Sequence, residues 1–424
     1  MVADADNALS PFHVLNTYLT FPNNYQSQWW TKTGPLLSKM LSSSGYTLEQ
    51  QYTYLTFFQN QLIPRLGPYP TAWHSTITVS GLPVEFSVNY QAKGGHPTVR
   101  ICTEPANSFS GTEKDPFNQG PPAEMLSHLS RSGLKGFDPT LFAYFTPRHT
   151  LSREEQNKLP TAVPGGAKIK TQHAFGFDLK DSGVVVKGYS YPGLKAHLAD
   201  PGNEKGKDIK TQLTEEVTDL QRSGVMDAVK PWTVISEYMT ECSGWGFHNL
   251  WAWDYITPSS SRLKFYSFVM DVPDKTKLAE LWTCGGRANS PAHQEGLKHL
   301  TALWDIIDLK NCGKRDLPKD AHQVPEGVAP MLWNYEMVPG HDLPIAKPYF
   351  PLQGLNDAVC VGKIQRYFEL LGWKELAAEF PRTVQGYFPD SDLAKTTNRV
   401  FWISFTYSEK TGVYLSVYYH PCPE

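Results

Sequence analysis

Five short segments of the chain place a cation or a tyrosine on one face and mostly small or aliphatic residues on the other. They recur at intervals of about 67 to 87 residues, at positions 99–101, 185–191, 262–266, 347–350 and 413–418. Neighbouring side chains of a β-strand point to opposite faces, so this period of two predicts strands. The side chains of Lys187, Tyr189 and Tyr191 then share one face of their strand. The opposite faces of the five segments are mostly small or aliphatic, and Phe265 is the exception.

Further strands and helices are predicted between these five segments. Positions 83–90, 331–337 and 399–407 also have strand-like patterns, whereas 35–62, 296–309 and 358–371 repeat apolar residues with a helical period. Gly372 supplies a stop for the last helix. The resulting order is helix, strand, strand, helix, repeated, and the Gly- and Pro-containing stretches 200–207 and 318–330 are predicted loops.

The spacing of the five segments indicates a loose fivefold repeat within one domain spanning residues 1–424. If every strand has one polar-aromatic face and one aliphatic face, a closed barrel satisfies both faces, with polar side chains inside and helices outside. We therefore predict an α+β fold with about ten strands around a ligand-sized lumen. The alternative is an open antiparallel sheet with one solvated face.

Composition narrows the class of protein. A net charge of −3 gives no reason to expect nucleic-acid binding, and aromatic residues make up 13% of the chain. No apolar run reaches the roughly 18 residues that span a bilayer, and the acidic start does not resemble a signal peptide. The six cysteines have no metal-ligand spacing, so reduced thiols and a cytoplasmic location are expected.

The cations and tyrosines of the predicted strands suit a particular chemistry. In a closed barrel, arginines and lysines from separate strands would converge and hold a diphosphate through charge-assisted hydrogen bonds. Electron-rich tyrosine rings would stabilise the carbocation left behind and shield it from water. Each residue also has a plainer interpretation, an exposed lysine or a tyrosine of the barrel core, and only the joint pattern favours the binding site.

Glu85 lies mid-strand on the face predicted to point inward. A buried carboxylate is costly without a partner, so it would accept a hydrogen bond from a ring N–H of a substrate or form a salt bridge inside the barrel. The chain lacks an Asp-Asp-x-x-Asp cluster, a P-loop, a dinucleotide fingerprint and a nucleophile elbow. Phosphate handling by protein cations, without a metal, is the chemistry that remains.

These segments resemble the fungal indole prenyltransferases of the dimethylallyltryptophan synthase family. The resemblance covers nearly the whole chain and rests on residues 29–30 (WW), 66–70 (LGPYP), 81–87 (GLPVEFS), 115–118 (DPFN), 186–189 (VKGY), 261–266 (SRLKFY), 281–283 (LWT) and 414–418 (YLSVY). It implies a ten-stranded antiparallel barrel of αββα units (the ABBA or PT barrel). It also implies transfer of a dimethylallyl group from dimethylallyl diphosphate to an aromatic ring, with no cofactor or obligatory metal.

The resemblance also implies roles for individual residues. Glu85 corresponds to the carboxylate that binds the indole N–H. The expected diphosphate clamp consists of Arg100, Lys187, Arg262, Lys264 and Lys347. The expected tyrosine shield consists of Tyr189, Tyr266, Tyr349, Tyr414 and Tyr418.

Two features bear on the acceptor. Members that prenylate free tryptophan carry an arginine just ahead of the Arg-x-Lys-x-Tyr strand, but no Lys or Arg occurs here between Lys230 and Arg262. The chain is most similar to members that act on tryptophan-containing cyclic dipeptides, which implies small-molecule partners and a monomer or homodimer. Ala174, beside His173, stands where C4-prenylating members carry a lysine base, which argues against prenylation at C4. Reverse prenylation at indole C2 is expected from the overall resemblance alone. The alternatives are a free amino acid or phenolic acceptor, and a non-catalytic barrel that binds an isoprenoid.

Overall fold

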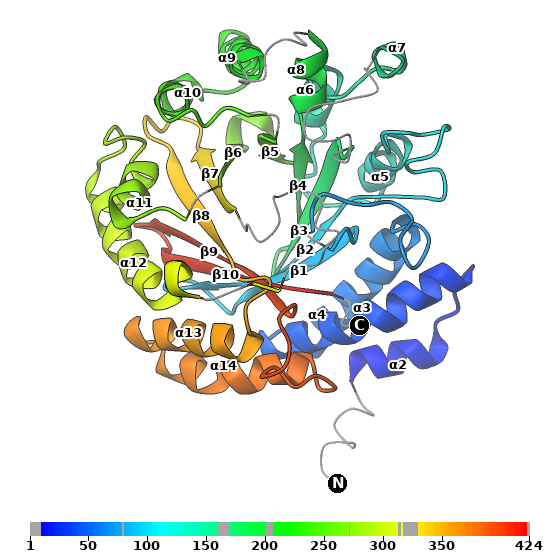
Figure 1. Ribbon diagram of the computed structural model, residues 1–424. Helices are drawn as coiled ribbons and strands as arrows, with labels where there is room; N and C mark the ends of the chain where they lie inside the picture. The colour runs from blue at the N-terminus through cyan, green and yellow to red at the C-terminus, as the bar shows by residue number, and fades with distance from the viewer. Residues whose placement is uncertain are drawn as a thin grey trace.

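Ten strands of the chain close into one antiparallel barrel, in the order β1-β10-β9-β8-β7-β6-β5-β4-β3-β2. The structure is a computed structural model that describes residues 10–78, 80–158, 170–199, 207–246, 248–270, 272–312, 315–316 and 330–421. Helices form a ring around the barrel (Figure 1). The predicted α+β barrel is confirmed, and closure leaves no sheet edge exposed.

The strands are arranged as hairpins of consecutive pairs. They are β1 (Val84–Gln91), β2 (Thr98–Thr103), β3 (His173–Lys180), β4 (Gly183–Ser190), β5 (Leu250–Asp254), β6 (Leu263–Val269), β7 (Met331–Met337), β8 (Ile345–Pro351), β9 (Val400–Ser408) and β10 (Gly412–Tyr419). The five segments first singled out in the sequence lie on the even-numbered strands, the second strand of each hairpin. The turns within the hairpins therefore lie at one end of the barrel, and the connections that contain helices lie at the other.

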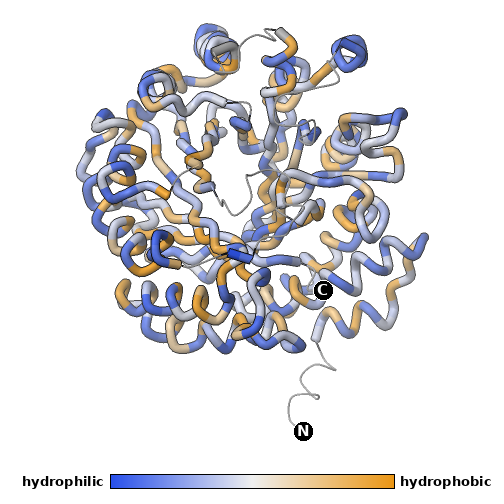
Figure 2. The backbone as a smooth tube through the Cα atoms, in the orientation of Figure 1, coloured by the Kyte–Doolittle hydropathy of each residue, from blue (hydrophilic) through white to orange (hydrophobic). Residues whose placement is uncertain are grey.

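The helices between the hairpins pack against the outside of the barrel. The longer ones are α2 (Pro11–Tyr18), α3 (Asn24–Ser43), α4 (Leu48–Phe57), α5 (Gly120–Arg131), α6 (Thr140–His149), α9 (Lys207–Arg222), α10 (Val229–Glu241), α11 (Lys275–Trp282), α12 (Pro291–Ile307), α13 (Asp357–Leu370) and α14 (Lys374–Tyr387). The short ones are η1 (Phe58–Leu62), η2 (Ile63–Arg65), α7 (Arg153–Gln156), α8 (Gly193–Ala199), η3 (Pro258–Ser260) and η4 (Leu309–Asn311). Figure 2 shows hydrophilic and hydrophobic positions alternating along this ring, as expected of helices with one face against the sheet.

The first predicted helix, over residues 35–62, differs from the structure. Two helices occupy this region: α3 begins at Asn24, and α4 begins at Leu48. Gly45 separates them in a left-handed conformation (φ 80°), which a helix interior does not accommodate. The helices predicted at 296–309 and 358–371 correspond to α12 and α13. Of the predicted loops, residues 200–206 and 318–329 lie outside the described residues.

The outward faces of the strands are more aromatic than the predicted aliphatic pattern. Trp251, Trp253, Trp333 and Tyr335 point outward with Phe265, and all five are buried under the helices. The ring of Trp251 meets that of Trp232 on α10 edge-on, with ring centroids 5.5 Å apart. Large rings fill the space between helices and strands on this side of the barrel, so Phe265 is one of a group rather than an exception. The five cysteines within the described residues, Cys102, Cys242, Cys284, Cys312 and Cys360, have free thiols.

Candidate active site

The registers of the ten strands bring the predicted site residues into one lumen. Lys187 lies opposite Asp254 on β5 and Gly176 on β3, and Lys264 lies opposite Glu336 on β7. Arg100 lies opposite Asp178 on β3, and Lys347 lies opposite Asn334 on β7. Because directly paired residues of a sheet share a face, all of these side chains point into the barrel.

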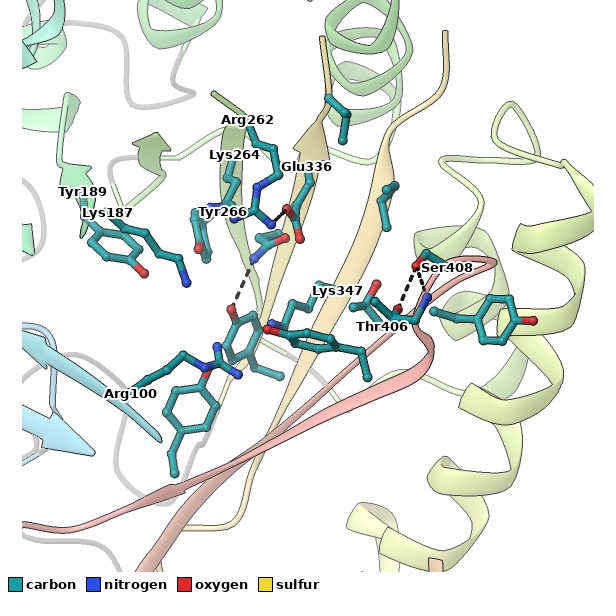
Figure 3. A pocket seen from close by; sticks show the side chains of 18 residues that line it. Arg100, Lys187, Tyr189, Arg262, Lys264, Tyr266, Glu336, Lys347, Thr406 and Ser408 are labelled. Atoms are coloured by element: carbon teal, nitrogen blue, oxygen red, sulfur yellow. Dashed lines mark hydrogen bonds and ion pairs between the residues drawn. The ribbon is translucent and has the colours of Figure 1, made fainter. Parts of the chain in front are cut away.

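A cavity of about 170 Å³ occupies this lumen (Figure 3). All five predicted clamp cations and all five predicted tyrosines line it, together with Asn334, Glu336 and residues near the hairpin turns such as Val338, Ile345 and Thr411. Four different strands or their immediate ends contribute the five cations, which converge on the same space: Arg100, Lys187, Arg262, Lys264 and Lys347. This geometry can hold an anion with several oxygens from more than one side.

Three carboxylates alternate with these cations, and the sequence analysis did not single them out. Both oxygens of Asp178 accept hydrogen bonds from Lys187 Nζ at 2.6 Å. Asp254 accepts from Arg262 at 2.7 and 3.0 Å and from Lys264 at 3.1 Å. Glu336 accepts from Arg262 Nη1 at 2.7 Å. A pattern in the sequence could have identified these acids. Each lies two positions from a residue that faces the lumen on the same strand, namely Gly176, Ala252 or Asn334.

The electrostatics of the pairs follow from burial and neighbouring charge. Burial alone would raise the pKa of Asp178, but Lys187 and Arg100 lower it to about 2. Lys264 and Arg262 likewise hold the pKa of Asp254 well below its usual range against the effect of burial. Burial and Arg262 lower the pKa of Lys264 to about 8. Burial and Arg100 lower the pKa of Lys347 well below its usual value.

The tyrosines form a continuous aromatic surface beside the charges. Ring centroids lie 6.2 Å apart between Tyr189 and Tyr266, 6.3 Å between Tyr266 and Tyr349, and 5.9 Å between Tyr349 and Tyr418. Tyr414 stands slightly apart, with Lys347 Nζ 4.8 Å and Arg100 Cζ 5.6 Å from its ring centroid. Such rings attract cations by roughly 0.5 to 2 kcal/mol each.

Hydrogen bonds fix several of these side chains. Asn334 Nδ2 donates to the hydroxyl of Tyr349 at 3.2 Å, and Arg100 donates to Ser416 Oγ. Asn334 and Ser416 are lumen residues that sequence reasoning missed. Amide and hydroxyl side chains are common on strands, so only the barrel register distinguishes them from surface residues.

Glu85 lies farther from the hairpin turns than the clamp and does not line the cavity described above. It is opposite Cys102 on β2, and its side chain is buried with 8% of the residue exposed. Glu85 Oε1 has no hydrogen-bond partner among the described residues. Burial raises the pKa of Glu85 to about 8. The salt bridge considered for Glu85 is therefore not formed with any described residue, and one oxygen is available to a ligand.

The strand positions beyond the tyrosines carry neutral side chains apart from Glu85. The residues that face the lumen at these positions include Cys102, Ala174, Leu250, Phe268, Leu332 and Trp402. His173 has the opposite parity, and its ring stacks on Phe142 with centroids 4.9 Å apart. Its pKa is lowered by burial to about 4. His173 therefore belongs to the outer packing, and Ala174 faces the lumen.

Among the described residues, no group of three or more His, Cys, Asp or Glu side chains is placed to bind a metal ion. The helices of the described ranges include none with the length and apolar character of a membrane span.

Comparison with known proteins places this barrel in a family. The family model for tryptophan dimethylallyltransferase matches residues 25–383. A tryptophan dimethylallyltransferase of Emericella nidulans is 63% identical over 418 residues, covering 99% of this chain and 95% of the relative.

Solved structures agree. A crystal structure of NotF in complex with brevianamide F and DMSPP has 37% identity and a TM-score of 0.86, covering 97% of this chain and 99% of that chain. AnaPT from Neosartorya fischeri has 30% identity and a TM-score of 0.83, covering 97% and 98%. The chain belongs to the tryptophan dimethylallyltransferase family and is an aromatic prenyltransferase with an ABBA barrel, as its resemblance to fungal indole prenyltransferases indicated.

Proposed function

We propose that this enzyme transfers a dimethylallyl group from dimethylallyl diphosphate to the indole ring of a tryptophan-containing cyclic dipeptide, by reverse attachment at C2 and without a required metal. The observation that carries the proposal is one lumen with three parts. Five cations line one region, five tyrosine rings lie beside them, and Glu85 with an unpartnered oxygen lies beyond the rings.

The clamp would drive the first step. As the allylic C–O bond breaks, both electrons go to the diphosphate oxygen, and the negative charge that develops there is stabilised by Arg100, Lys187, Arg262, Lys264 and Lys347. Preorganised donors in a buried site are effective because they need little reorganisation as charge develops. The allylic cation that forms is held by the tyrosine faces, which also exclude water.

Glu85 would act on the acceptor. Its carboxylate accepts a hydrogen bond from the indole N–H and increases the electron density of the ring. The indole C2 then forms a bond to the tertiary carbon of the allylic cation, and loss of the proton from C2 restores aromaticity. Ala174 and Leu250, which lie at this end of the lumen, have no group that could accept this proton.

Metal independence is supported by the use of the lumen carboxylates. Both oxygens of Asp178 and of Asp254, and one oxygen of Glu336, are engaged by lysine or arginine side chains. The five basic side chains supply the positive charge that a magnesium ion would otherwise provide.

The choice of a cyclic dipeptide is supported by the neutral lining beyond the tyrosines. The strand positions there include no lysine or arginine to pair with a free carboxylate. A crystallised relative was solved with brevianamide F, whereas a relative of higher identity is named for tryptophan. Free tryptophan is therefore the second candidate acceptor, favoured by that 63% identity.

Parallel incubations with dimethylallyl diphosphate in EDTA test the proposal. The acceptors are cyclo-(Trp-Pro), free tryptophan, tyrosine and a polycyclic phenol, and products are followed by mass spectrometry. We expect a monoprenylated cyclo-(Trp-Pro) whose NMR spectrum shows a quaternary carbon attached at indole C2. Preferential turnover of tryptophan would replace the acceptor assignment, and turnover only with magnesium would overturn metal independence. A barrel that binds the diphosphate but forms no product would support the isoprenoid-binding alternative.

A further inference from the structure

The clamp contains its own anions, and each of them occupies donors that a diphosphate would need. Asp178 occupies Lys187 through both of its oxygens and lies 4.0 Å from Arg100 Nε. Asp254 bridges Arg262 and Lys264. Most of the clamp is therefore ion-paired within the protein.

Glu336 extends the arrangement to β7, the strand next to β6. Its Oε2 lies 2.7 Å from Arg262 Nη1, so Arg262 is held between Glu336 and Asp254. Lys347 differs from the other four cations: its Nζ lies over the rings of Tyr349 and Tyr414, 5.6 and 4.8 Å from their centroids. Arg262 is also the most exposed of the paired cations, with 36% of its side chain accessible, whereas Lys187 and Lys264 are nearly buried.

The charge balance of this cluster has a consequence for turnover. The formal charges of the five cations and the three carboxylates leave two positive charges in excess. Without the carboxylates, five buried cations would repel one another when the lumen is empty and attract the product diphosphate strongly after the reaction. The negative charge of the carboxylates reduces the repulsion between the cations. The carboxylates also weaken the attraction for the diphosphate, because they compete with it for the same N–H donors.

We propose that Asp178, Asp254 and Glu336 are internal counter-ions that compete with the diphosphate for the clamp side chains and weaken its binding enough for the product to leave. They are positioning residues that act through the cations. The inference rests on the proposed binding of a diphosphate in this lumen, and it does not depend on which acceptor is used.

Binding of inorganic pyrophosphate, measured by isothermal titration calorimetry in EDTA, tests the inference. Asp254→Asn keeps the size of the side chain and removes its charge, so we expect its Kd to fall at least about tenfold below that of the unmodified enzyme. Because pyrophosphate is also the product, its inhibition constant should fall in parallel and kcat should fall with slower product release. A carboxylate with a purely structural role would give the opposite result, since its loss would loosen the clamp and weaken binding.

Three further variants complete the experiment. Asp305→Asn removes an aspartate that is ion-paired with Lys275 on the outer helices, and it should leave the Kd unchanged. Asp254→Glu restores the charge and should return the Kd toward the original value. Glu336→Gln provides a second test at the more exposed pair in case Asp254→Asn does not fold, with folding checked by thermal melting.

The possible results separate two failures. Unchanged or weaker pyrophosphate binding in Asp254→Asn or Glu336→Gln, with clear binding to the unmodified enzyme, overturns the counter-ion proposal alone. No pyrophosphate binding to the unmodified enzyme overturns the diphosphate clamp itself and the counter-ion proposal with it.

Discussion

Glu85 differs from the other three lumen carboxylates in having no ion pair with a lysine or an arginine among the described residues. Asp178, Asp254 and Glu336 contact lysine or arginine, whereas Glu85 lies beyond the tyrosines opposite Cys102. A buried carboxylate without compensation is destabilising, so the fold retains it at a cost. We attribute that cost to its proposed action on the acceptor.

Replacing Glu85 with glutamine tests this role. Glu85→Gln keeps the shape and one acceptor oxygen but removes the charge, and we expect kcat/KM for the acceptor to fall by about 10²-fold or more. The melting temperature should be equal or higher, because the buried carboxylate is no longer present. Retention of full activity would exclude Glu85 from the reaction. Asp305→Asn on the outer surface serves as the control and should change neither quantity.

The pH dependence of the enzyme follows from two buried groups. Burial raises the pKa of Glu85 to about 8, so the ionised form that binds the indole N–H is gained as pH rises toward 8. Burial and Arg262 lower the pKa of Lys264 to about 8, so the clamp loses a positive charge above that pH. The profile of kcat/KM should therefore be a narrow bell with its maximum near pH 8.

Initial rates at low substrate concentration from pH 6 to 10 measure this profile. Glu85→Gln should lack the acidic limb in its residual activity, and Lys264→Arg should lack the alkaline limb, since arginine stays charged. A flat profile of the unmodified enzyme between pH 6 and 8 would contradict the assignment of Glu85.

At the scale of elements, β4 and β5 pack through a glycine. Gly188 faces outward, and a Cβ added there would lie 2.6 Å from Cε2 of Trp253 on β5. Gly188→Ala should lower the free energy of unfolding by about 1 to 3 kcal/mol, because a buried ring and two strands have to shift. Urea denaturation measures the change.

Gly362 on α13 provides a matched control for this substitution. A Cβ there meets no atom within 4 Å, so Gly362→Ala should raise the free energy of unfolding by about 0.5 to 1 kcal/mol. Changes of the same sign and size at both glycines would show that the contact with Trp253 does not limit the packing of this hairpin.

Helix and strand positions were predictable where the pattern is local. The five alternating segments, the strands at 83–90, 331–337 and 399–407, and the helices α12 and α13 were all expected from side-chain periodicity. The division of residues 35–62 into α3 and α4 was not, because apolar spacing continues across Gly45. The aromatic outer face was also missed, since a tryptophan that packs under a helix has the same sequence pattern as any other strand residue.

At the scale of the molecule, the clamp connects most of the barrel. Arg100, Lys187, Lys264 and Lys347 lie on β2, β4, β6 and β8, so a bound diphosphate would link strands around most of the circumference. Inorganic pyrophosphate should therefore stabilise the folded state, by about 2.7 kcal/mol at a concentration 100 times its Kd.

For a protein of 424 residues, this corresponds to a rise in melting temperature of about 3 °C. Differential scanning calorimetry in EDTA measures it, with sulfate at the same ionic strength as the control. Lys187→Ala should reduce the shift. Equal shifts with sulfate and pyrophosphate would indicate nonspecific anion effects instead of a diphosphate clamp.

The parity of the strands, the fivefold repeat and the residue types of the lumen can be read from the sequence alone. Alternation with a period of two is a local property, and cations beside tyrosines on the same face can be read without knowing which strands are neighbours. Residue identity was also sufficient to select Glu85, since a carboxylate between Val84 and Phe86 has to be explained.

Only the tertiary structure decided how these residues combine. Asp178, Asp254 and Glu336 lie up to 158 positions apart in the chain, and only the pairing of β3, β5 and β7 with their neighbours places them among the cations. Burial raises the pKa of Glu85, and burial is a property of the closed barrel rather than of β1. Charge, pKa and the partners of a side chain depend on contacts between distant segments, and these contacts exist only once the barrel is closed.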